Sequence, residues 1–117
     1  MRFFAAVAFA AAVMSSAAFA ADPVGRYTVS GVSPGGGGSY SGTATVTKTG
    51  DTFKVVWKIG SQTYVGTGVG DHGFMAISYK SGSETGLALY GEDGEGWKGV
   101  WTYQGGTTLG AETWARQ

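Results

Sequence analysis

The chain has 117 residues, with 22 glycines, no cysteine, and eight basic side chains against eight acidic ones. This balanced charge excludes an electrostatic attraction for nucleic acid or for an anionic lipid surface. The absence of cysteine excludes disulfides, thiolate metal ligands and a cysteine nucleophile. A packed core and a closed hydrogen-bond ladder must therefore stabilise the fold.

The first 20 residues have the order of a secretory signal peptide. Arg2 gives a positive start, an apolar run extends from Phe3 to Met14, and small residues end at Ala20. The run is shorter than the roughly 20 residues that a membrane-spanning helix needs. We expect a cleaved signal peptide at residues 1–20 and a single domain at 21–117. The protein would be exported, periplasmic or secreted, with no stable membrane insertion.

The rest of the chain contains eight short runs rich in Val, Thr, Tyr, Trp and Phe, the composition of β-strands. In chain order they are residues 26–32, 39–48, 52–59, 62–69, 74–80, 85–91, 97–103 and 107–115. The connections are too short for the crossovers of a dozen or more residues that parallel strands require. The spacing predicts an all-β fold, an antiparallel up-and-down meander of about eight strands.

Pairing the last strand with the first would hide both edges of such a meander. We therefore expect a closed barrel, lipocalin-like or avidin-like in architecture, with essentially no helix after the signal peptide. A two-layer sandwich remains the alternative, although only residues 33–38 are long enough to switch sheets. The glycine run 35–38 within that segment is expected to be a flexible loop. A membrane-spanning barrel is disfavoured by outward Thr and Lys residues.

Alternation assigns one face of each run to the interior. In residues 52–59 the apolar positions alternate with Lys54 and Lys58, and in residues 39–48 the threonines share one face, which we expect to be outside. Residues 74–80 are ambiguous, because both of their faces carry apolar side chains. Elsewhere the predicted interior contains Tyr40, Ala44, Val46, Phe53, Val55, Trp57, Ile59, Tyr64, Gly66, Gly68, Gly86, Ala88, Tyr90, Trp97, Gly99, Trp101, Tyr103, Gly110, Glu112 and Trp114.

Aromatic residues recur two positions from a glycine on four or five of these runs. A large ring needs a neighbouring strand position without a side chain, and glycine also lets a small barrel coil tightly. We expect Gly66, Gly86 and Gly99 to make room for rings on adjacent strands.

Several stretches resemble a group of small exported bacterial proteins that often carry the label "fibronectin-binding protein". The likeness covers nearly all of residues 21–117, and it implies export and a β-rich fold. It brings no catalytic residues with it. The stretches are Gly25-Arg26-Tyr27, Tyr40-Ser41-Gly42-Thr43, Trp57-Lys58-Ile59-Gly60, Tyr64-Val65-Gly66-Thr67-Gly68, Thr85-Gly86-Leu87-Ala88-Leu89-Tyr90, Trp97-Lys98-Gly99-Val100-Trp101 and Gly110-Ala111-Glu112.

The chain lacks a recognisable catalytic, metal or phosphate-binding motif. His72 is the only histidine and is expected in an exposed turn. The acidic turn 92–95 lacks the Asp-x-Asp-x-Asp-Gly calcium spacing, and the glycines at 35–38 lack the Lys-Ser or Lys-Thr of a phosphate loop. We predict no metal, no cofactor and no catalytic residue.

Glu112 is the one charged side chain that alternation places inside the barrel. An unpaired buried carboxylate costs several kcal/mol. We expect it to accept hydrogen bonds from backbone groups or from a Tyr or Trp donor. A contact with a ligand, or a role as a lone general acid, remains an alternative.

These features predict a non-catalytic binding or interaction module, which would use its loops to contact another protein. The first alternative is a carrier of a small apolar or aromatic ligand, and the weaker one is a hydrolase that uses Glu112. Eight strands enclose an interior that is either filled by side chains or holds one small molecule, and the many aromatics favour a filled one. The carrier would use Trp57, Tyr64, Tyr90, Trp97 and Trp101 at the barrel mouth, together with Glu112.

Overall fold

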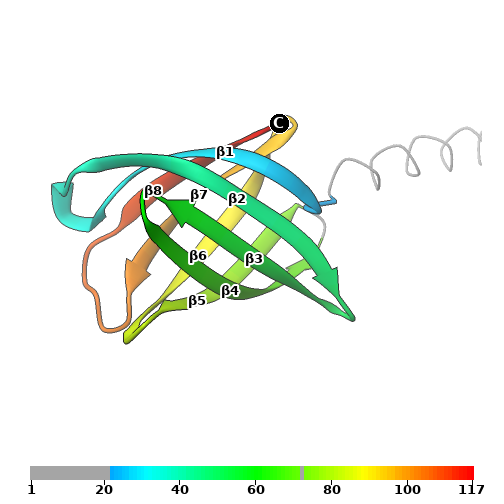
Figure 1. Cartoon of the computed structure of the whole chain (residues 1–117). Helices are drawn as coiled ribbons and strands as arrows, with labels where there is room; N and C mark the ends of the chain where they lie inside the picture. The colour runs from blue at the N-terminus through cyan, green and yellow to red at the C-terminus, as the bar shows by residue number, and fades with distance from the viewer. Residues whose placement is uncertain (1–21, 72) are drawn as a thin grey trace, which may run out of the picture.

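The protein is a closed antiparallel barrel of eight strands that follow one another in chain order (Figure 1). The computed structural model describes residues 22–71 and 73–117. The predicted signal peptide at 1–20, the start at Ala21 and the exposed turn at His72 lie outside these residues. The strands are β1 (Gly25–Val32), β2 (Ser39–Thr49), β3 (Thr52–Ile59), β4 (Gln62–Asp71), β5 (Phe74–Ser81), β6 (Glu84–Asp93), β7 (Gly96–Tyr103) and β8 (Gly110–Arg116).

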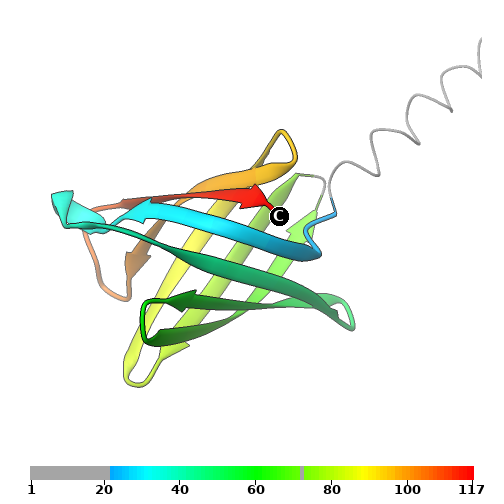
Figure 2. The same cartoon turned by 45° about the horizontal axis from the view of Figure 1, so that its top comes forward.

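The barrel closes where β8 pairs with β1, and the predicted up-and-down barrel is confirmed. Val29 lies opposite Trp114 in this last ladder, and Figure 2 shows β8 running beside β1. Closure leaves no separate second layer, so the sandwich alternative is excluded. The hairpins turn tightly at positions such as Gly60 and Gly82, whose φ angles of 62° and 59° favour glycine.

Most strand boundaries lie within two residues of the prediction, and the largest difference is at the start of the last strand, predicted at residue 107. β8 begins at Gly110 because pairing with β7 starts at Trp101 opposite Gly110. Residues 107–109 instead form a loop, held by a hydrogen bond of 2.8 Å from Thr102 Oγ1 to the carbonyl of Thr108. The segment expected to be a flexible loop contains a three-residue 3₁₀ turn at Pro34–Gly36.

The alternation of buried and exposed residues follows the predicted faces, and it resolves the ambiguity of β5. Met75, Ile77 and Tyr79 are buried, and Phe74 is exposed. The register explains this choice, because Tyr79 lies opposite glycines on both neighbouring strands. The two glycines leave room for the ring of Tyr79 inside the barrel.

The predicted packing of rings over glycines is also confirmed. A Cβ atom at Gly99 would lie 2.8 Å from Cδ1 of Tyr90, and one at Gly66 would lie 3.0 Å from Cζ3 of Trp57. Gly86 faces the ring of Tyr79 in the same way. A Cβ at any of these positions would require a neighbour to move.

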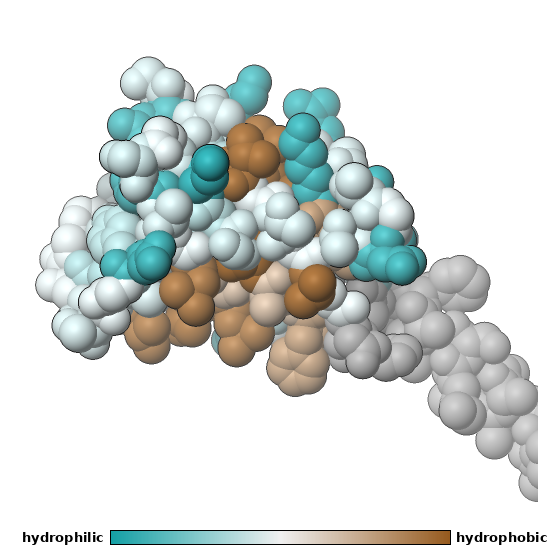
Figure 3. Space-filling view, turned by 90° about the horizontal axis from the view of Figure 1, so that it is seen from below, coloured by the Kyte–Doolittle hydropathy of each residue, from teal (hydrophilic) through white to brown (hydrophobic). Residues whose placement is uncertain are grey.

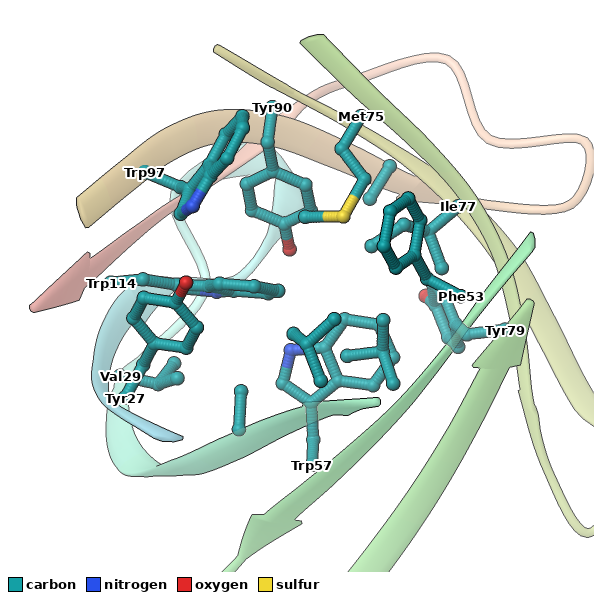
Figure 4. Packing of buried hydrophobic residues seen from close by; sticks show 14 residues of the cluster. Tyr27, Val29, Phe53, Trp57, Met75, Ile77, Tyr79, Tyr90, Trp97 and Trp114 are labelled. Carbon is teal, nitrogen blue, oxygen red and sulfur yellow. The ribbon is translucent and has the colours of Figure 1, made fainter. Parts of the chain in front are cut away.

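One end of the barrel, here called the packed end, is filled with side chains of the buried hydrophobic cluster that Figure 4 shows. It holds the turns at 50–51 and 94–95 and the C-terminal end of β8. Trp114 lies with its ring centroid 4.6 Å from that of Tyr90 and 5.2 Å from that of Tyr27. The largest fully buried side chains among the described residues are Tyr27, Val29, Val46, Val55, Met75, Tyr90, Trp97 and Trp114.

Arg116 covers the packed end. Its guanidinium donates hydrogen bonds to the backbone carbonyls of Val24 and Asp22 and to the hydroxyl of Tyr27. Its Nε also donates to the carbonyl of Glu95. The start of the domain and the β6–β7 turn are thereby tied over the aromatic cluster.

The outward Thr and Lys residues predicted a polar outer surface. The outer surface is polar only in part. Apolar residues gather along one side of the barrel, while most of the visible surface beside them is polar (Figure 3). The apolar outer face is formed by β4 to β7, whose outward positions carry few charges. Its exposed large residues are Val65, Val69, Phe74, Leu87, Leu89 and Val100. Across residues 22–71 and 73–117, no helix has the length and apolar character needed to cross a membrane.

Candidate binding site

The opposite end of the barrel, here called the open end, contains a cavity of about 240 Å³. The expectation that aromatic side chains fill the interior is therefore correct for the packed end only. The open end carries the turns at 33–38, 60–61 and 82–83 and the loop 104–109. The cavity is lined by Ser33, Tyr40, Trp57, Ile59, Tyr64, Tyr79, Glu84, Ala88, Tyr90, Trp101, Tyr103 and Glu112.

Trp97 does not belong to this mouth, contrary to the sequence-based prediction. Trp97 and Trp101 share the inward face of β7 but are four residues apart, about 13 Å along a strand. Trp97 therefore lies in the packed end, where it is 2% exposed. The other predicted residues line the cavity: Trp57, Tyr64, Tyr90, Trp101 and Glu112.

Glu112 lies at the floor of the cavity and accepts four side-chain hydrogen bonds. Oε1 accepts from Trp57 Nε1 at 2.9 Å and from Trp114 Nε1 at 2.7 Å. The hydroxyl of Tyr90 also donates to Oε1, at 2.7 Å, and the hydroxyl of Tyr40 donates to Oε2 at 2.6 Å. The expectation of Tyr and Trp donors is confirmed. Three of the four donors share Oε1, whereas Oε2 accepts from Tyr40 alone and keeps one of its two lone-pair sites.

Two glycines explain how both tyrosines reach the same carboxylate. Gly31 on β1 lies opposite Tyr40 on one side and opposite Glu112 on the other. Gly99 on β7 lies between Glu112 and Tyr90 in the same manner. Five adjacent strands therefore present the row Tyr–Gly–Glu–Gly–Tyr at one level of the barrel. Each tyrosine reaches across a strand that has no side chain to obstruct it.

The charge and burial of this row keep its tyrosines protonated. The pKa of Tyr90 is raised well above its ordinary value, mainly by burial and then by the nearby charge of Glu112. Burial, followed by the charge of Glu112, also raises the pKa of Tyr40. Both hydroxyls therefore act as hydrogen-bond donors to the carboxylate at neutral pH.

Aromatic rings form the wall of the cavity above this row. Tyr79 packs edge to face against Trp57, Tyr64 and Trp101, with ring centroids 6.0 to 6.2 Å apart. Tyr40 contacts Trp101 in the same geometry. Offset and edge-to-face contacts of this kind are the preferred arrangements of aromatic pairs. These contacts between rings hold the wall of the cavity in place.

One polar group of this wall is unsatisfied. Among the described residues, the buried Nε1 of Trp101 has no hydrogen-bond partner. A buried donor without an acceptor costs about 1–3 kcal/mol. This nitrogen lies against Gly110 on β8, where an added Cβ atom would be 2.7 Å from it.

Sequence reasoning does not assign several lining residues to the site. Alternation places Tyr40 and Tyr103 on the inner face but not at the mouth, and it leaves Tyr79 ambiguous. The usable signal is position along the strand: the inward residue nearest the turns at 33–38, 60–61 and 82–83 lies at the open end. Ser33 and Glu84 lie just outside the predicted runs 26–32 and 85–91, and they carry no such signal.

The described ranges 22–71 and 73–117 contain no group of three or more His, Asp or Glu side chains able to hold a metal ion. The cavity at the open end is lined mainly by aromatic side chains. Its polar groups are the hydroxyls of Ser33 and the tyrosines, the indole of Trp101 and the carboxylates of Glu84 and Glu112.

No family model and no curated protein matches the chain. A solved structure of a redesigned β-barrel is similar to it, with a TM-score of 0.69 and 16% sequence identity. The similarity covers 81% of this chain and 91% of the other. At this identity the comparison supports the barrel fold alone. The resemblance to the exported bacterial group remains a prediction.

Proposed function

We propose that this barrel is a non-catalytic binding protein that takes a small organic ligand into its open end. The observation that carries this proposal is the aromatic cavity of about 240 Å³ at the open end, beyond a packed end whose side chains are buried. Ligand sites are typically concave and aromatic, with a few placed polar groups. The cavity is smaller than the roughly 300–1,000 Å³ of drug-sized sites, so the ligand is small.

The surroundings of Glu112 argue against the hydrolase alternative. A general acid must hold a proton and pass it to a substrate. The two oxygens of Glu112 instead receive four hydrogen bonds, and an indole N–H can only donate. The carboxylate is thus occupied in holding two tyrosines and two tryptophans in place. Its role in this proposal is to order the floor of the binding site.

The proposal can be tested by nuclear magnetic resonance of the labelled protein. A panel of small aromatic and aliphatic compounds is titrated while the four indole N–H signals are followed. A ligand in the open end shifts the signals of Trp57 and Trp101 in a saturable way and leaves that of Trp97 in place. Absence of saturable shifts with every compound, or equal shifts at Trp97, would contradict the proposal.

A matched pair of variants localises the site. Ala88 lines the cavity, so Ala88→Leu places extra atoms in it and should weaken binding at least about tenfold, a change of about 1.4 kcal/mol. Ala111 lies on the exposed face of β8, and Ala111→Leu adds the same atoms outside the barrel. Binding by this control variant should be unchanged.

The apolar outer face supports a second candidate, association with another protein. We propose that its occupant is a second copy of this chain. A groove over this face is lined by Ala, Ser and Thr positions together with Val69, Ile77, Leu87, Leu89, Val100, Trp101 and Leu109, and none of its lining residues is charged. Two copies can therefore meet there without like-charge repulsion. Exposed contiguous apolar patches are typical of interaction sites.

Light scattering after size-exclusion chromatography tests this candidate. The unchanged protein should have the mass of a dimer, and Leu87→Lys should have that of a monomer. Thr43→Lys, an exposed change on the polar side of the barrel, should remain dimeric. A monomeric mass for the unchanged protein across the micromolar range would exclude self-association.

A further inference from the structure

The open end has a one-sided distribution of charge. Two carboxylates, Glu84 and Glu112, line the cavity, and none of its lining residues is Lys, Arg or His. Lys58 and Lys80 lie on nearby strands, but their exposed side chains belong to the outer face. The cavity therefore contains negative groups and no positive side chain to balance them.

The charge of Glu112 should act strongly on a ligand in the cavity, because the Glu112 side chain is only 6% exposed. Its partners are neutral hydroxyl and indole groups, which supply dipoles but no opposite charge. Charges interact more strongly in the poorly screened interior of a protein than in water. A cation in the cavity would gain from this negative field, whereas an anion would be repelled.

Glu84 extends the same field to the rim. Its charge raises the pKa of Tyr64 and of Tyr79, in both cases after the larger effect of burial. Tyr79 also experiences the charge of Glu112. The two carboxylates therefore act on the same aromatic wall from the mouth and from the floor.

The wall itself favours a particular kind of cation. Aromatic faces attract organic cations, with tryptophan and tyrosine among the most effective, and clusters of such rings can surround an ammonium group. Seven of the twelve lining residues are tyrosine or tryptophan. Rings of this kind bind methyl groups around a positive nitrogen better than they bind a strongly hydrated metal ion.

From these contacts we propose that the ligand of the open end is a small organic ammonium compound. The inference rests on the proposed binding function and names its ligand class. The positive nitrogen lies among the rings between Glu84 and Glu112.

Three probes of similar shape and different charge test the inference by calorimetry and by the indole signals. They are choline, the neutral alcohol in which carbon replaces its nitrogen, and pivalate. We expect choline to bind at least about tenfold more tightly than the neutral alcohol, with no detectable binding of pivalate. The indole signals of Trp57 and Trp101 should shift with choline.

Variants that neutralise one charge distinguish the effect of the negative field on binding from the effect of the cavity's shape. Glu84→Gln should weaken choline binding roughly threefold or more and leave binding of the neutral alcohol unchanged. Glu95→Gln removes the same charge from an exposed turn at the packed end and should alter neither. Because Glu84 is outside the hydrogen-bonded row of Glu112, the variant is expected to fold.

The outcomes distinguish this inference from the function on which it rests. If the neutral alcohol or another neutral compound binds as tightly as choline, the cationic ligand class is wrong while the binding function stands. If no probe and no compound of the wider panel binds, both are wrong. Equal weakening of choline and the alcohol in Glu84→Gln would also overturn the electrostatic argument.

Discussion

The packed end and the open end are built from the same kinds of side chain, yet only one of them is filled. At the packed end, Tyr27, Trp97 and Trp114 are almost completely buried, and Arg116 ties the neighbouring backbone over them. At the open end, Tyr64 and Trp101 remain partly exposed around a cavity. Aromatic content alone therefore does not determine whether a small barrel is solid.

The row containing Glu112 marks the boundary between the two ends. Trp114 donates to its carboxylate from the packed side, while Tyr40 and Trp57 also line the cavity. One buried acidic group thus fixes rings that belong to both halves. A substitution that removes this hydrogen-bonded row should therefore lower the free energy of unfolding more than a substitution at either end.

The largest expected effect is that of Glu112→Leu. Leucine removes the acceptor of four donors, and each buried donor left unpaired costs about 1–3 kcal/mol. We expect a loss of at least about 4 kcal/mol from a domain stability of about 5–15 kcal/mol. Urea unfolding followed by tryptophan fluorescence measures this loss. The loss for Glu112→Gln should be intermediate, because the amide retains one oxygen acceptor.

Glu84→Leu is the control for the boundary. Glu84 is partly exposed at the mouth and has no role in the hydrogen-bonded row, so the change should cost less than about 1 kcal/mol. Similar losses for Glu112→Leu and Glu84→Leu would show that the row does not hold the two ends together.

A second pair of variants compares the ends directly. Met75→Ala creates a cavity in the packed end, where Met75 is fully buried, and should cost about 2–4 kcal/mol. Ile59→Ala only widens an existing cavity at the partly buried open end, and we expect a cost of about 1 kcal/mol. Chemical denaturation of both variants gives the two values. A larger loss for Ile59→Ala would mean that the open end contributes more packing than its cavity indicates.

A third pair tests the glycines that the rings require. Gly99→Val places a branched side chain against Tyr90 and against the backbone of Leu89, and overpacking of this kind costs about 1–3 kcal/mol. Thr45→Val, on the outward face of β2, should change stability by no more than about 0.5 kcal/mol. Equal effects in urea melts would argue against a filled interior at Gly99.

The fold followed from the sequence because its signals are local. Strand composition, turns such as Gly60-Ser61, and alternation along 52–59 each identify one element, and short connections leave few topologies. The choice of face in β5 was not available from β5 itself. It depends on Gly66 and Gly86, which lie opposite Tyr79 only once the register is known.

The site was less predictable because it depends on position along the barrel. Alternation placed Trp97 and Trp101 on one face, but it does not say which end is filled. The inward position of Glu112 was predictable, whereas its partners required the pairing of Gly31 and Gly99 with the tyrosines beyond them. The cavity exists because the side chains at the open end do not fill the volume that the strands enclose there. No single residue determines it.

The smallest expected effect concerns alkaline pH. Burial and Glu112 raise the pKa of Tyr90 well above the ordinary value near 10. Below pH 10 the tyrosine is protonated in the folded and unfolded states, so it contributes no pH dependence. Above pH 10 the unfolded chain releases this proton while the folded chain keeps it. Stability should therefore fall as pH rises, by about 1.4 kcal/mol per pH unit for this group.

Tyr90→Phe isolates this contribution. Urea melts at pH 8 and pH 11 give the alkaline loss for each protein, and the loss should be about 1.4 kcal/mol smaller in the variant. The comparison uses the change between two pH values because the phenylalanine ring cannot donate a hydrogen bond to Glu112, which lowers stability at both. An unchanged loss in Tyr90→Phe would mean that Tyr90 ionises as easily in the folded barrel as in the unfolded chain.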